Sequence, residues 1–451
     1  MSHKGKHAIV IGGSMGGLLA ARILTDHFEE VTIIDRDTFP EAAAHRRGVP
    51  QSRHTHGLLA SGRQVLERLF PGLCQELKDA GAVPGDMIGG SQWFFQGGLC
   101  AKFQSGLEGL LMSRPLVEYV VRKRVLAIPN LRVLEGAVVT GLESTRGNSQ
   151  VTGVKLEDRT IAADLVVDSS GRGSNASDWL DLMGFERPVI EKVEIGVGYT
   201  TRVFRRRPQD AGGDVAVVVP ASRQATRGGV MLAQEGDRWT VTLFSYFKDY
   251  APADVQGFRD YASRLPYQGI YDVIRDAEPI GEAYTARFPA SVRARYENLT
   301  RFPEGFLTFG DAICSFNPTF GQGMSTAALE ALELNQALAS GWDGLAMRFF
   351  KCAAKVVDIP WAVSVGADLA LPCTIGPRKL GVRLINWYIA KLHTAAHHDE
   401  VATLAFHKVA NLLAPPPSIL HPKVIWRVLK GNLVGRSAQG TVPATSVTQE
   451  A

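Results

Sequence analysis

The segment that most constrains the fold lies at the beginning of the chain. Residues 7–11 read HAIVI, an apolar run typical of a short buried strand. Glycines follow at positions 12, 13, 16 and 17, and residues 18–24 are rich in alanine and leucine, which favours a helix. A second apolar run at 31–34 ends in Asp35. Strand, glycine turn, helix, strand and acid in this order predict a right-handed βαβ unit.

The glycine turn has the composition of a phosphate-binding loop. Against the pattern G-x-G-x-x-G, Gly12 and Gly17 match, and Ser14 stands in place of the middle glycine. Glycines let backbone N–H groups approach a pyrophosphate, and the following helix adds a partial positive charge. Asp35, 23 residues after Gly12, can accept hydrogen bonds from ribose hydroxyls. We predict a dinucleotide site here; the alternative is a structural glycine turn in another α/β fold.

The hydrophobic pattern divides the rest of the chain. Residues 164–168 read as another buried parallel strand, and residues 131–143 and 151–157 as a small antiparallel meander. Alternation dominates at 185–300, which predicts a mostly antiparallel sheet inserted into the first domain. We therefore predict an α/β fold, α+β overall. Its parts are a Rossmann-like three-layer domain (1–184 and 301–345), the inserted sheet domain (185–300), a helical C-terminal region (346–431) and a disordered tail (432–451).

Composition excludes several classes of protein. The net charge of +4 is modest for 451 residues and gives no reason to expect nucleic-acid binding. The five cysteines are far apart and form no C-x-x-C, which argues against disulfides and zinc and favours a reduced, cytoplasmic location. We also expect no signal peptide and no transmembrane helix, because no leader pattern or run of 18 apolar residues occurs.

A second group of motifs lies near residue 310. Gly310-Asp311-Ala312 is followed by residues 317–324 (NPTFGQGM) and an alanine-rich segment. Asp311 can accept a hydrogen bond from a ligand hydroxyl, and the glycines let backbone N–H groups face an electron-rich ring at a helix start. Alone, the same residues are also compatible with a loop and a helix cap.

With these segments in place, the sequence resembles FAD-dependent monooxygenases of the p-hydroxybenzoate hydroxylase superfamily. Within them it looks closest to the bacterial branch that contains polyether epoxidases, with squalene epoxidase more distant. The resemblance rests on the glycine turn with Asp35, on residues 46–56 (RRGVPQSRHTH), on residues 113–118 (SRPLVE) and on residues 310–324. These motifs span about 7–330, and the chain beyond 340 resembles the same branch only loosely.

The resemblance implies an FAD-binding first domain with a substrate domain packed over the isoalloxazine. The glycine turn would bind the pyrophosphate, and Asp35 and Arg36 the adenosine end. One arginine of the pair 46–47 and Arg114 would contact the ribityl-phosphate region, Asp311 the ribityl chain, and residues 318 and 321–324 the isoalloxazine. The implied cofactor-binding residues are Gly12, Gly13, Ser14, Met15, Gly16, Gly17, Asp35, Arg36, Arg46, Arg47, Arg114, Val138, Asp311, Pro318, Gly321, Gln322, Gly323 and Met324.

One position departs from the family pattern. Members often carry Asp-Gly near residue 170, a motif tied to contacts with FAD and NAD(P)H, whereas this chain has Ser170-Gly171. Asp168 lies two residues earlier and is either a functional substitute or a strand-end residue. The electron source is therefore either NAD(P)H or a partner flavin reductase.

Two histidines are the candidate catalytic residues. His54 and His56 lie in a loop expected near the flavin, where they would position substrate or donate a proton, or only shape the loop. We predict no metal site, because further ligands at suitable spacing are missing. No catalytic triad is needed, since the flavin itself carries the oxygen chemistry. The absence of any Trp-x-Trp argues against the flavin-dependent halogenases.

The resemblance implies insertion of one oxygen atom from O2 into an organic substrate, by hydroxylation or epoxidation, through a flavin C4a-hydroperoxide shielded from water. The aromatic-bearing strands of the middle domain and the apolar C-terminal helices favour an apolar substrate. Two alternatives remain: an FAD-dependent reductase or saturase of prenyl chains, and a flavin-binding protein without turnover. For the apolar helices at 401–430, we favour packing on the FAD-binding domain over peripheral membrane contact.

Overall fold

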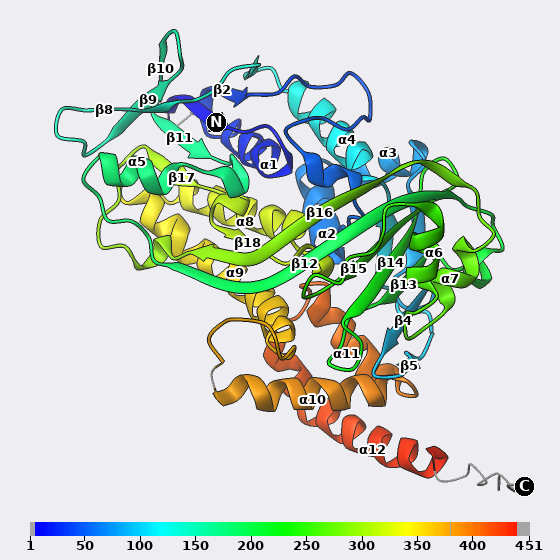
Figure 1. The fold of residues 1–451 in the computed structure, drawn as a ribbon. Helices are drawn as coiled ribbons and strands as arrows, with labels where there is room; N and C mark the ends of the chain where they lie inside the picture. The colour runs from blue at the N-terminus through cyan, green and yellow to red at the C-terminus, as the bar shows by residue number, and fades with distance from the viewer. Residues whose placement is uncertain (1–4, 379, 440–451) are drawn as a thin grey trace, which may run out of the picture.

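The computed structural model describes residues 5–378 and 380–439, and a five-stranded parallel sheet organises its N-terminal half. The strand order is β17 (Phe306–Thr308), β11 (Leu165–Asp168), β1 (Gly5–Ile11), β2 (Phe28–Asp35) and β7 (Leu131–Glu135). Every neighbouring pair is parallel. Helix α1 (Met15–Leu24) connects β1 to β2, so the predicted βαβ unit is confirmed (Figure 1).

Helices and a small sheet complete the three-layer domain. Helix α1 packs against α8 (Gly323–Ala339) and α4 (Arg114–Leu126), and α5 (Ala176–Leu182) follows β11. The small sheet has the order β10 (Thr160–Ala162), β9 (Val151–Lys155) and β8 (Gly141–Ser144). The predicted meander was wrong at its first strand, because β7 pairs in parallel with β2. A half-exposed edge strand alternates like a meander strand, and the sequence pattern does not distinguish them.

An eight-stranded, mostly antiparallel sheet is the second large sheet of the molecule. Its order is β18 (Cys314–Ser315), β16 (Pro279–Ala294), β12 (Ile190–Arg205), β15 (Arg238–Ser245), β14 (Arg227–Gln234), β13 (Ala216–Val219), β4 (Ser91–Phe95) and β5 (Gly98–Leu99). Within this sheet, the long strands β12 and β16 extend beyond the other strands toward α8 and α9 (Figure 1). The predicted range 185–300 omitted β4, β5 and β18. Strand β4 pairs in parallel with β13, more than 100 residues later in the chain. A local sequence pattern does not predict a pairing over this distance.

Shorter elements fill the space around the sheets. Helices α6 (Val255–Ala262) and α7 (Gly269–Ile274) cover one face of the large sheet around the buried Trp239. Helices α2 (Ala60–Leu69) and α3 (Leu73–Asp79) lie beside a hairpin-like pair, β3 (Val83–Asp86) and β6 (Glu108–Leu111).

The C-terminal region is helical, as expected, and lies along the lower edge of the molecule in Figure 1. It contains α9 (Leu345–Asp368), α10 (Leu380–Ala396), α11 (Glu400–Ala410), a 3-10 turn (Pro416–Leu420) and α12 (Pro422–Gln439). These helices share a hydrophobic cluster with Trp93 and Phe95 of β4. None of the helices in residues 5–378 and 380–439 has the length and mean hydropathy needed to cross a bilayer.

The predicted disordered tail was wrong for residues 432–439, which continue α12. The amide of Asn432 donates to the carbonyl oxygens of Lys391 and Val428 at 2.8 and 2.7 Å. Just before this segment, Gly431 lies against Ala395 of α10, where its lack of a side chain allows the two helices to pack closely. Residues 440–451 lie outside the described part of the chain.

Candidate active site

A single cavity of about 2620 Å³ lies between the parallel sheet, the large antiparallel sheet and the C-terminal helices. Ser14, Met15 and Gly16 line one end, and Asp311 and the segment 317–324 line its middle. The far end is lined by side chains of β4, α10 and α11. Pockets for drug-sized ligands occupy roughly 300–1,000 Å³, so this cavity has room for a dinucleotide and a second molecule.

The glycine turn at one end of the cavity is tightly constrained. Gly12 has a φ of +94°, and a Cβ at Gly17 would lie 1.7 Å from the Gly12 carbonyl oxygen. The first N–H groups of α1 have no partner within the helix, and the Ser14 side chain does not cap them. Because residues 14–16 line the cavity, these donors are available to an anionic group there.

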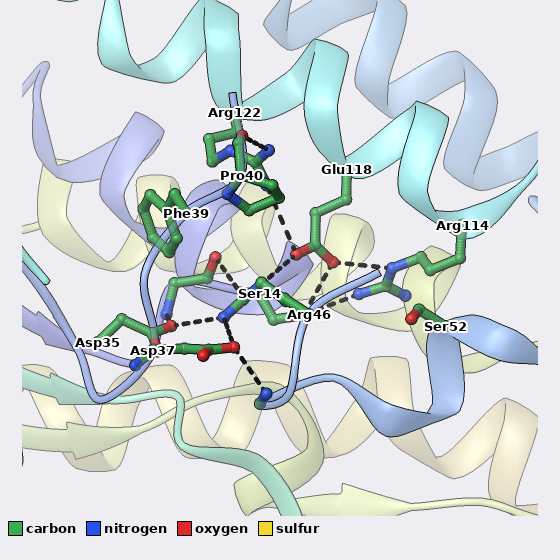
Figure 2. Close-up of polar contacts among 12 residues, drawn as sticks. Ser14, Asp35, Asp37, Phe39, Pro40, Arg46, Ser52, Arg114, Glu118 and Arg122 are labelled. Carbon is green, nitrogen blue, oxygen red and sulfur yellow. Dashed lines mark hydrogen bonds and ion pairs between the residues drawn. The ribbon is translucent and has the colours of Figure 1, made fainter. Parts of the chain in front are cut away.

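A buried charge cluster supports the turn from behind, as Figure 2 shows. Glu118 accepts hydrogen bonds from Arg46 Nε at 3.1 Å, Arg114 Nε at 3.0 Å and Ser14 Oγ at 3.2 Å. Arg114 Nη2 in turn donates to Ser14 Oγ at 2.8 Å. Burial alone would raise the pKa of Glu118, but Arg114 and Arg46 outweigh it and the pKa is lowered. Glu118 is therefore a carboxylate that holds Ser14 and Arg114 in place.

Arg46 and Asp35 complete this support (Figure 2). Arg46 Nη1 donates to Asp35 Oδ2 at 3.2 Å, and Arg46 Nη2 donates to the Gly13 carbonyl at 3.0 Å. Asp35 Oδ2 also accepts from the Gly13 N–H at 2.7 Å. Burial would lower the pKa of Arg46, but Glu118 and Asp35 raise it overall. In this geometry Arg46 and Asp35 fasten the glycine turn to the end of β2.

Asp311 lies opposite the turn, with its side chain in the cavity. Among residues 5–378 and 380–439 its carboxylate has no hydrogen-bond or ion-pair partner, so it is free to accept from a ligand hydroxyl. Burial raises its pKa, while Arg114 and Arg172 act in the opposite direction. The preceding Gly310 N–H donates to Glu330 at 2.9 Å, and burial raises the pKa of Glu330 to about 8.

The segment after Asp311 leads into α8 and forms the middle wall. Gly321 has a φ of +66°, which turns the chain into the helix beginning at Gly323. The first N–H groups of α8 therefore face the same cavity as those of α1. The buried Asn317 anchors the segment: its amide donates to Tyr246 Oη at 2.9 Å and to Asp368 Oδ1 at 2.8 Å. Burial raises the pKa of Asp368 to about 7.

Comparison with known proteins places this site in a family. No protein-family model matches the chain. Protein Rv3254 of Mycobacterium tuberculosis (strain ATCC 25618 / H37Rv) is 36% identical over 447 residues, which cover 95% of this chain and 94% of that protein. The chain belongs to the family of Protein Rv3254. Kynurenine 3-monooxygenase of Salinispora tropica is 24% identical over 375 residues, 79% of this chain and 78% of that enzyme.

Solved structures confirm the fold of this Rv3254 family member. The flavin-dependent brominase Bmp2 superposes with a TM-score of 0.66 at 14% identity, covering 97% of this chain and all of that one. PqsL, a probable FAD-dependent monooxygenase from Pseudomonas aeruginosa, gives a TM-score of 0.59 at 18% identity over 81% of this chain and 98% of its own. The predicted Rossmann-like fold with a helical C-terminal region is thus confirmed. The relatives named here agree with the predictions of a flavin cofactor and an oxidoreductase.

The predicted cofactor residues separate into three groups in this family member. Those that line the cavity are Ser14, Met15, Gly16, Arg36, Arg114, Asp311, Pro318, Gly321, Gln322, Gly323 and Met324. Gly12, Gly13, Gly17, Asp35 and Arg46 shape or support the turn instead. Arg47 and Val138 are exposed and do not line the cavity in the described part of the chain. The Arg46–Arg47 pair therefore supplies a structural arginine, and Arg114 is the one at the cavity wall.

The two candidate catalytic histidines line the cavity, but both are neutral. His54 Nδ1 lies 2.9 Å from Thr201 Oγ1 of β12, and burial lowers the pKa of His54 to about 4. His56 Nδ1 lies 2.9 Å from the His54 carbonyl, so it is the donor there. Burial and the nearby Arg114 lower the pKa of His56 to about 3. Neither is an imidazolium acid near neutral pH, which favours positioning over proton donation.

Asp168 is a structural residue of the turn after β11. It is completely buried and accepts from the Ser170 N–H at 2.9 Å and from Ser174 Oγ at 2.6 Å. Burial raises its pKa, against these hydrogen bonds. Ser170 and Gly171 line the cavity, whereas Asp168 does not, so Asp168 does not replace the missing aspartate.

Sequence reasoning missed four polar residues of the site. Glu118 and Arg114 are four residues apart on α4, a spacing that signals a helical ion pair. Arg172 lines the cavity and lies 4.4 Å from the ring centre of Phe288. Glu330 and Asp368 lie on helices that read as apolar, and only the tertiary structure brings them to the site.

Proposed function

We propose that this chain is an FAD-dependent monooxygenase that inserts one oxygen atom from O2 into an apolar organic substrate by hydroxylation or epoxidation. One observation carries the proposal: a single cavity joins a dinucleotide-type end to a large apolar end. The kynurenine 3-monooxygenases among the relatives and the monooxygenase PqsL among the neighbours support this reaction class. The resemblance to polyether epoxidases adds epoxidation as one of the two outcomes.

The residues present fit FAD. The N–H groups at the start of α1 and the Arg114 guanidinium would hold the pyrophosphate and neighbouring phosphate oxygens. The unpartnered Asp311 carboxylate would accept from the ribityl hydroxyls, and the start of α8 would face the isoalloxazine. When bound, FAD supplies the activation of O2, and the chain supplies binding, orientation and exclusion of water.

The substrate side of the cavity is built from apolar side chains. The sheet contributes Trp93, Val230, Leu232 and Phe244, and the C-terminal helices face them across the cavity with residues such as Phe406. An apolar wall keeps water away from a reactive oxygen species, which prevents its hydrolysis. His56 belongs to the same wall, and because its Nδ1–H donates to the His54 carbonyl, Nε2 of the neutral ring can accept from a substrate hydroxyl without adding charge.

The loop that carries His54 and Thr55 is hydrogen-bonded to the large antiparallel sheet at the cavity wall. Thr201 Oγ1 and Thr242 Oγ1 lie 2.6 Å apart, and Thr55 Oγ1 lies 2.5 Å from Thr242 Oγ1. With His54 on Thr201, this chain of hydrogen bonds joins the loop to β12 and β15. The loop therefore keeps one orientation, which is what regioselective oxygen insertion requires.

The electron source follows from the turn at Ser170. Because Asp168 is buried, the turn presents a serine hydroxyl and a glycine where members of the resembled superfamily often carry Asp-Gly. We propose that a partner flavin reductase delivers the electrons, with NAD(P)H as direct donor the alternative. Anaerobic mixing of the FAD-loaded protein with NADPH or NADH tests this: rapid bleaching of the flavin would overturn the reductase proposal.

The reaction class is tested with isotopically labelled oxygen. The FAD-loaded protein, a reductase system and a panel of apolar aromatic and alkene compounds are incubated under ¹⁸O2. We expect one labelled oxygen atom in the product. Turnover of isoprenoid alkenes without oxygen would instead identify a prenyl reductase or saturase. Absence of any substrate-dependent flavin oxidation would identify a flavin-binding protein without turnover.

A further inference from the structure

The C-terminal helices expose a large apolar surface. We define the C-terminal apolar face by the side chains that project from α10, the 3-10 turn and α12: Leu384, Trp387, Leu420, Trp426, Leu429 and Leu433. Trp426 and Trp387 are 56% and 58% exposed, and Leu429 is 61% exposed. Single exposed apolar residues are ordinary, but a contiguous group marks an interaction surface.

Helix α12 shows why this surface is not core packing. Val424, Val428 and Gly431 face α10 and are buried or in close contact with it. Trp426, Leu429 and Leu433, spaced three and four residues apart, form a second apolar stripe on the exposed side. One stripe suffices to dock the helix, so the second has no partner within the described part of the chain.

The charged residues on α10 and α12 are all basic. Neither α10 nor α12 contains an aspartate or glutamate. Arg383, Lys423 and Lys430 have no carboxylate within 4.0 Å among residues 5–378 and 380–439, and Lys430 Nζ lies 5.4 Å from the ring centre of Trp426. Asp399 precedes α11 as its N-cap residue and is paired with Arg427 of α12 at 2.8 Å. The face is thus apolar with basic residues beside it.

We propose that the C-terminal apolar face docks on the surface of a bilayer containing anionic lipids. Tryptophan is favoured at the level of the headgroups, where its ring is apolar and its N–H stays hydrated. Unpaired lysines beside an apolar helix face add attraction to anionic lipid. A second protein copy fits less well, because the core of a protein interface is depleted of lysine.

The docking surface continues into the cavity. Arg383, Trp387 and Leu420 belong to the exposed region and also line the cavity wall. A chain docked in this way places the cavity beside the acyl region, where apolar molecules concentrate. If the proposed monooxygenase function holds, its substrate is a lipophilic molecule that enters from the bilayer. This last step rests on the proposed function, whereas the docking itself does not.

Vesicle co-sedimentation of the full chain tests the docking. We use vesicles of equal parts phosphatidylcholine and phosphatidylserine, and vesicles of phosphatidylcholine alone. The variant Trp426→Ser/Leu429→Ser/Leu433→Ser removes the exposed stripe, and we expect the partition coefficient on the mixed vesicles to fall by about 100-fold or more. Lys423→Gln/Lys430→Gln should lower it by roughly fivefold per lysine, with the remaining attraction screened by salt.

The matched control is Leu182→Ser/Val189→Ser, which removes apolar side chains that are 82% and 67% exposed elsewhere. It should bind the mixed vesicles like the unmodified chain, and FAD content measured on every variant reports correct folding. Lack of binding by the unmodified chain, or equal loss in the control, would overturn the proposal. So would a concentration-dependent dimer that the stripe variant abolishes, because the occupant would then be a second copy. Binding is read without turnover, so it stands or falls apart from the proposed reaction.

Discussion

The substitution Glu118→Gln removes one charge from the cluster behind the glycine turn and preserves the shape of the side chain. In the cluster, Glu118, Asp35 and Asp37 face Arg46, Arg114 and Arg122, with Arg122 Nη1 4.0 Å from Glu118. The side chains of Glu118, Arg46 and Arg114 are only 5–7% exposed. The variant leaves three buried arginines opposite two carboxylates. In glutamine an amide nitrogen replaces one of the two carboxylate oxygens. At Oε2, which accepts from Arg114 and Ser14, this nitrogen would face the Arg114 guanidinium as a second donor.

The expected loss is large because the cluster is buried. Removing one partner of a buried ion pair costs about 3–5 kcal/mol, since the other charge remains without solvent. We therefore expect the free energy of unfolding to fall by about 3 kcal/mol or more. FAD binding should weaken as well, because Ser14 and Arg114 lose the group that positions them. The pKa of Glu118 is lowered, so its stabilisation is present above the ordinary value of 4.5 and is lost as the pH falls further.

Urea unfolding followed by circular dichroism measures the loss, and flavin fluorescence titration measures FAD affinity. The matched control is Glu76→Gln, which breaks an ion pair with Arg124 of 2.6 Å whose side chains are 27% and 39% exposed. Exposed pairs of this kind contribute roughly 0.2–1 kcal/mol. The reasoning is refuted if Glu118→Gln costs no more than Glu76→Gln, or if it leaves FAD affinity unchanged. It is also refuted if the variant keeps the acid-side decline that the carboxylate explains.

Three further substitutions test other parts of the site. Asp311→Asn should weaken FAD binding by about 10- to 100-fold, the value of one charge-assisted hydrogen bond, with circular dichroism unchanged. Gly17→Ala should abolish folded, FAD-retaining protein, because its Cβ would lie 1.7 Å from the Gly12 oxygen; normal FAD content after purification would contradict this. In the folded chain the pKa of Asp368 is raised from 3.8 to about 7, so stability should decline as the pH rises through that range. Asp368→Asn should make the decline shallower without removing it, because the raised pKa of Glu330 contributes over the same range; an identical pH profile of the melting temperature would refute the assignment.

The N-terminal half of the site was accessible from the sequence because its determinants are local. Strand, turn and helix at residues 5–24 follow one another within the span over which hydrophobic periodicity and glycine content are informative. The same holds for Asp311 and the start of α8, which lie a few residues apart. These segments were predicted with their roles, and the structure places both helix starts and Asp311 in one cavity.

The features of the site that the sequence did not predict depend on contacts between residues far apart in the chain. Arg46 was assigned to the cofactor from the family resemblance, but in the structure Glu118 and Asp35 accept its hydrogen bonds. The distal wall of the cavity combines β4 with α10 and α11, some 300 residues later, and neither segment carries a motif. The exposed stripe of α12 was read as an ordinary apolar helix, since periodicity shows that a face is apolar and not what covers it.

The charge cluster also explains why turn geometry governs cofactor binding more than the number of arginines. Arg114 is paired with Glu118, and Arg46 with Asp35, so much of their positive charge is offset before a ligand arrives. The N–H groups of the α1 terminus, which the Ser14 side chain does not cap, are further donors at this end, and the helix dipole adds up to about 2 kcal/mol in a partly buried setting. These donors point into the cavity only while Gly12 and Gly17 keep the turn closed. The arginines therefore position the turn, and loss of the turn removes the binding energy of the whole phosphate end.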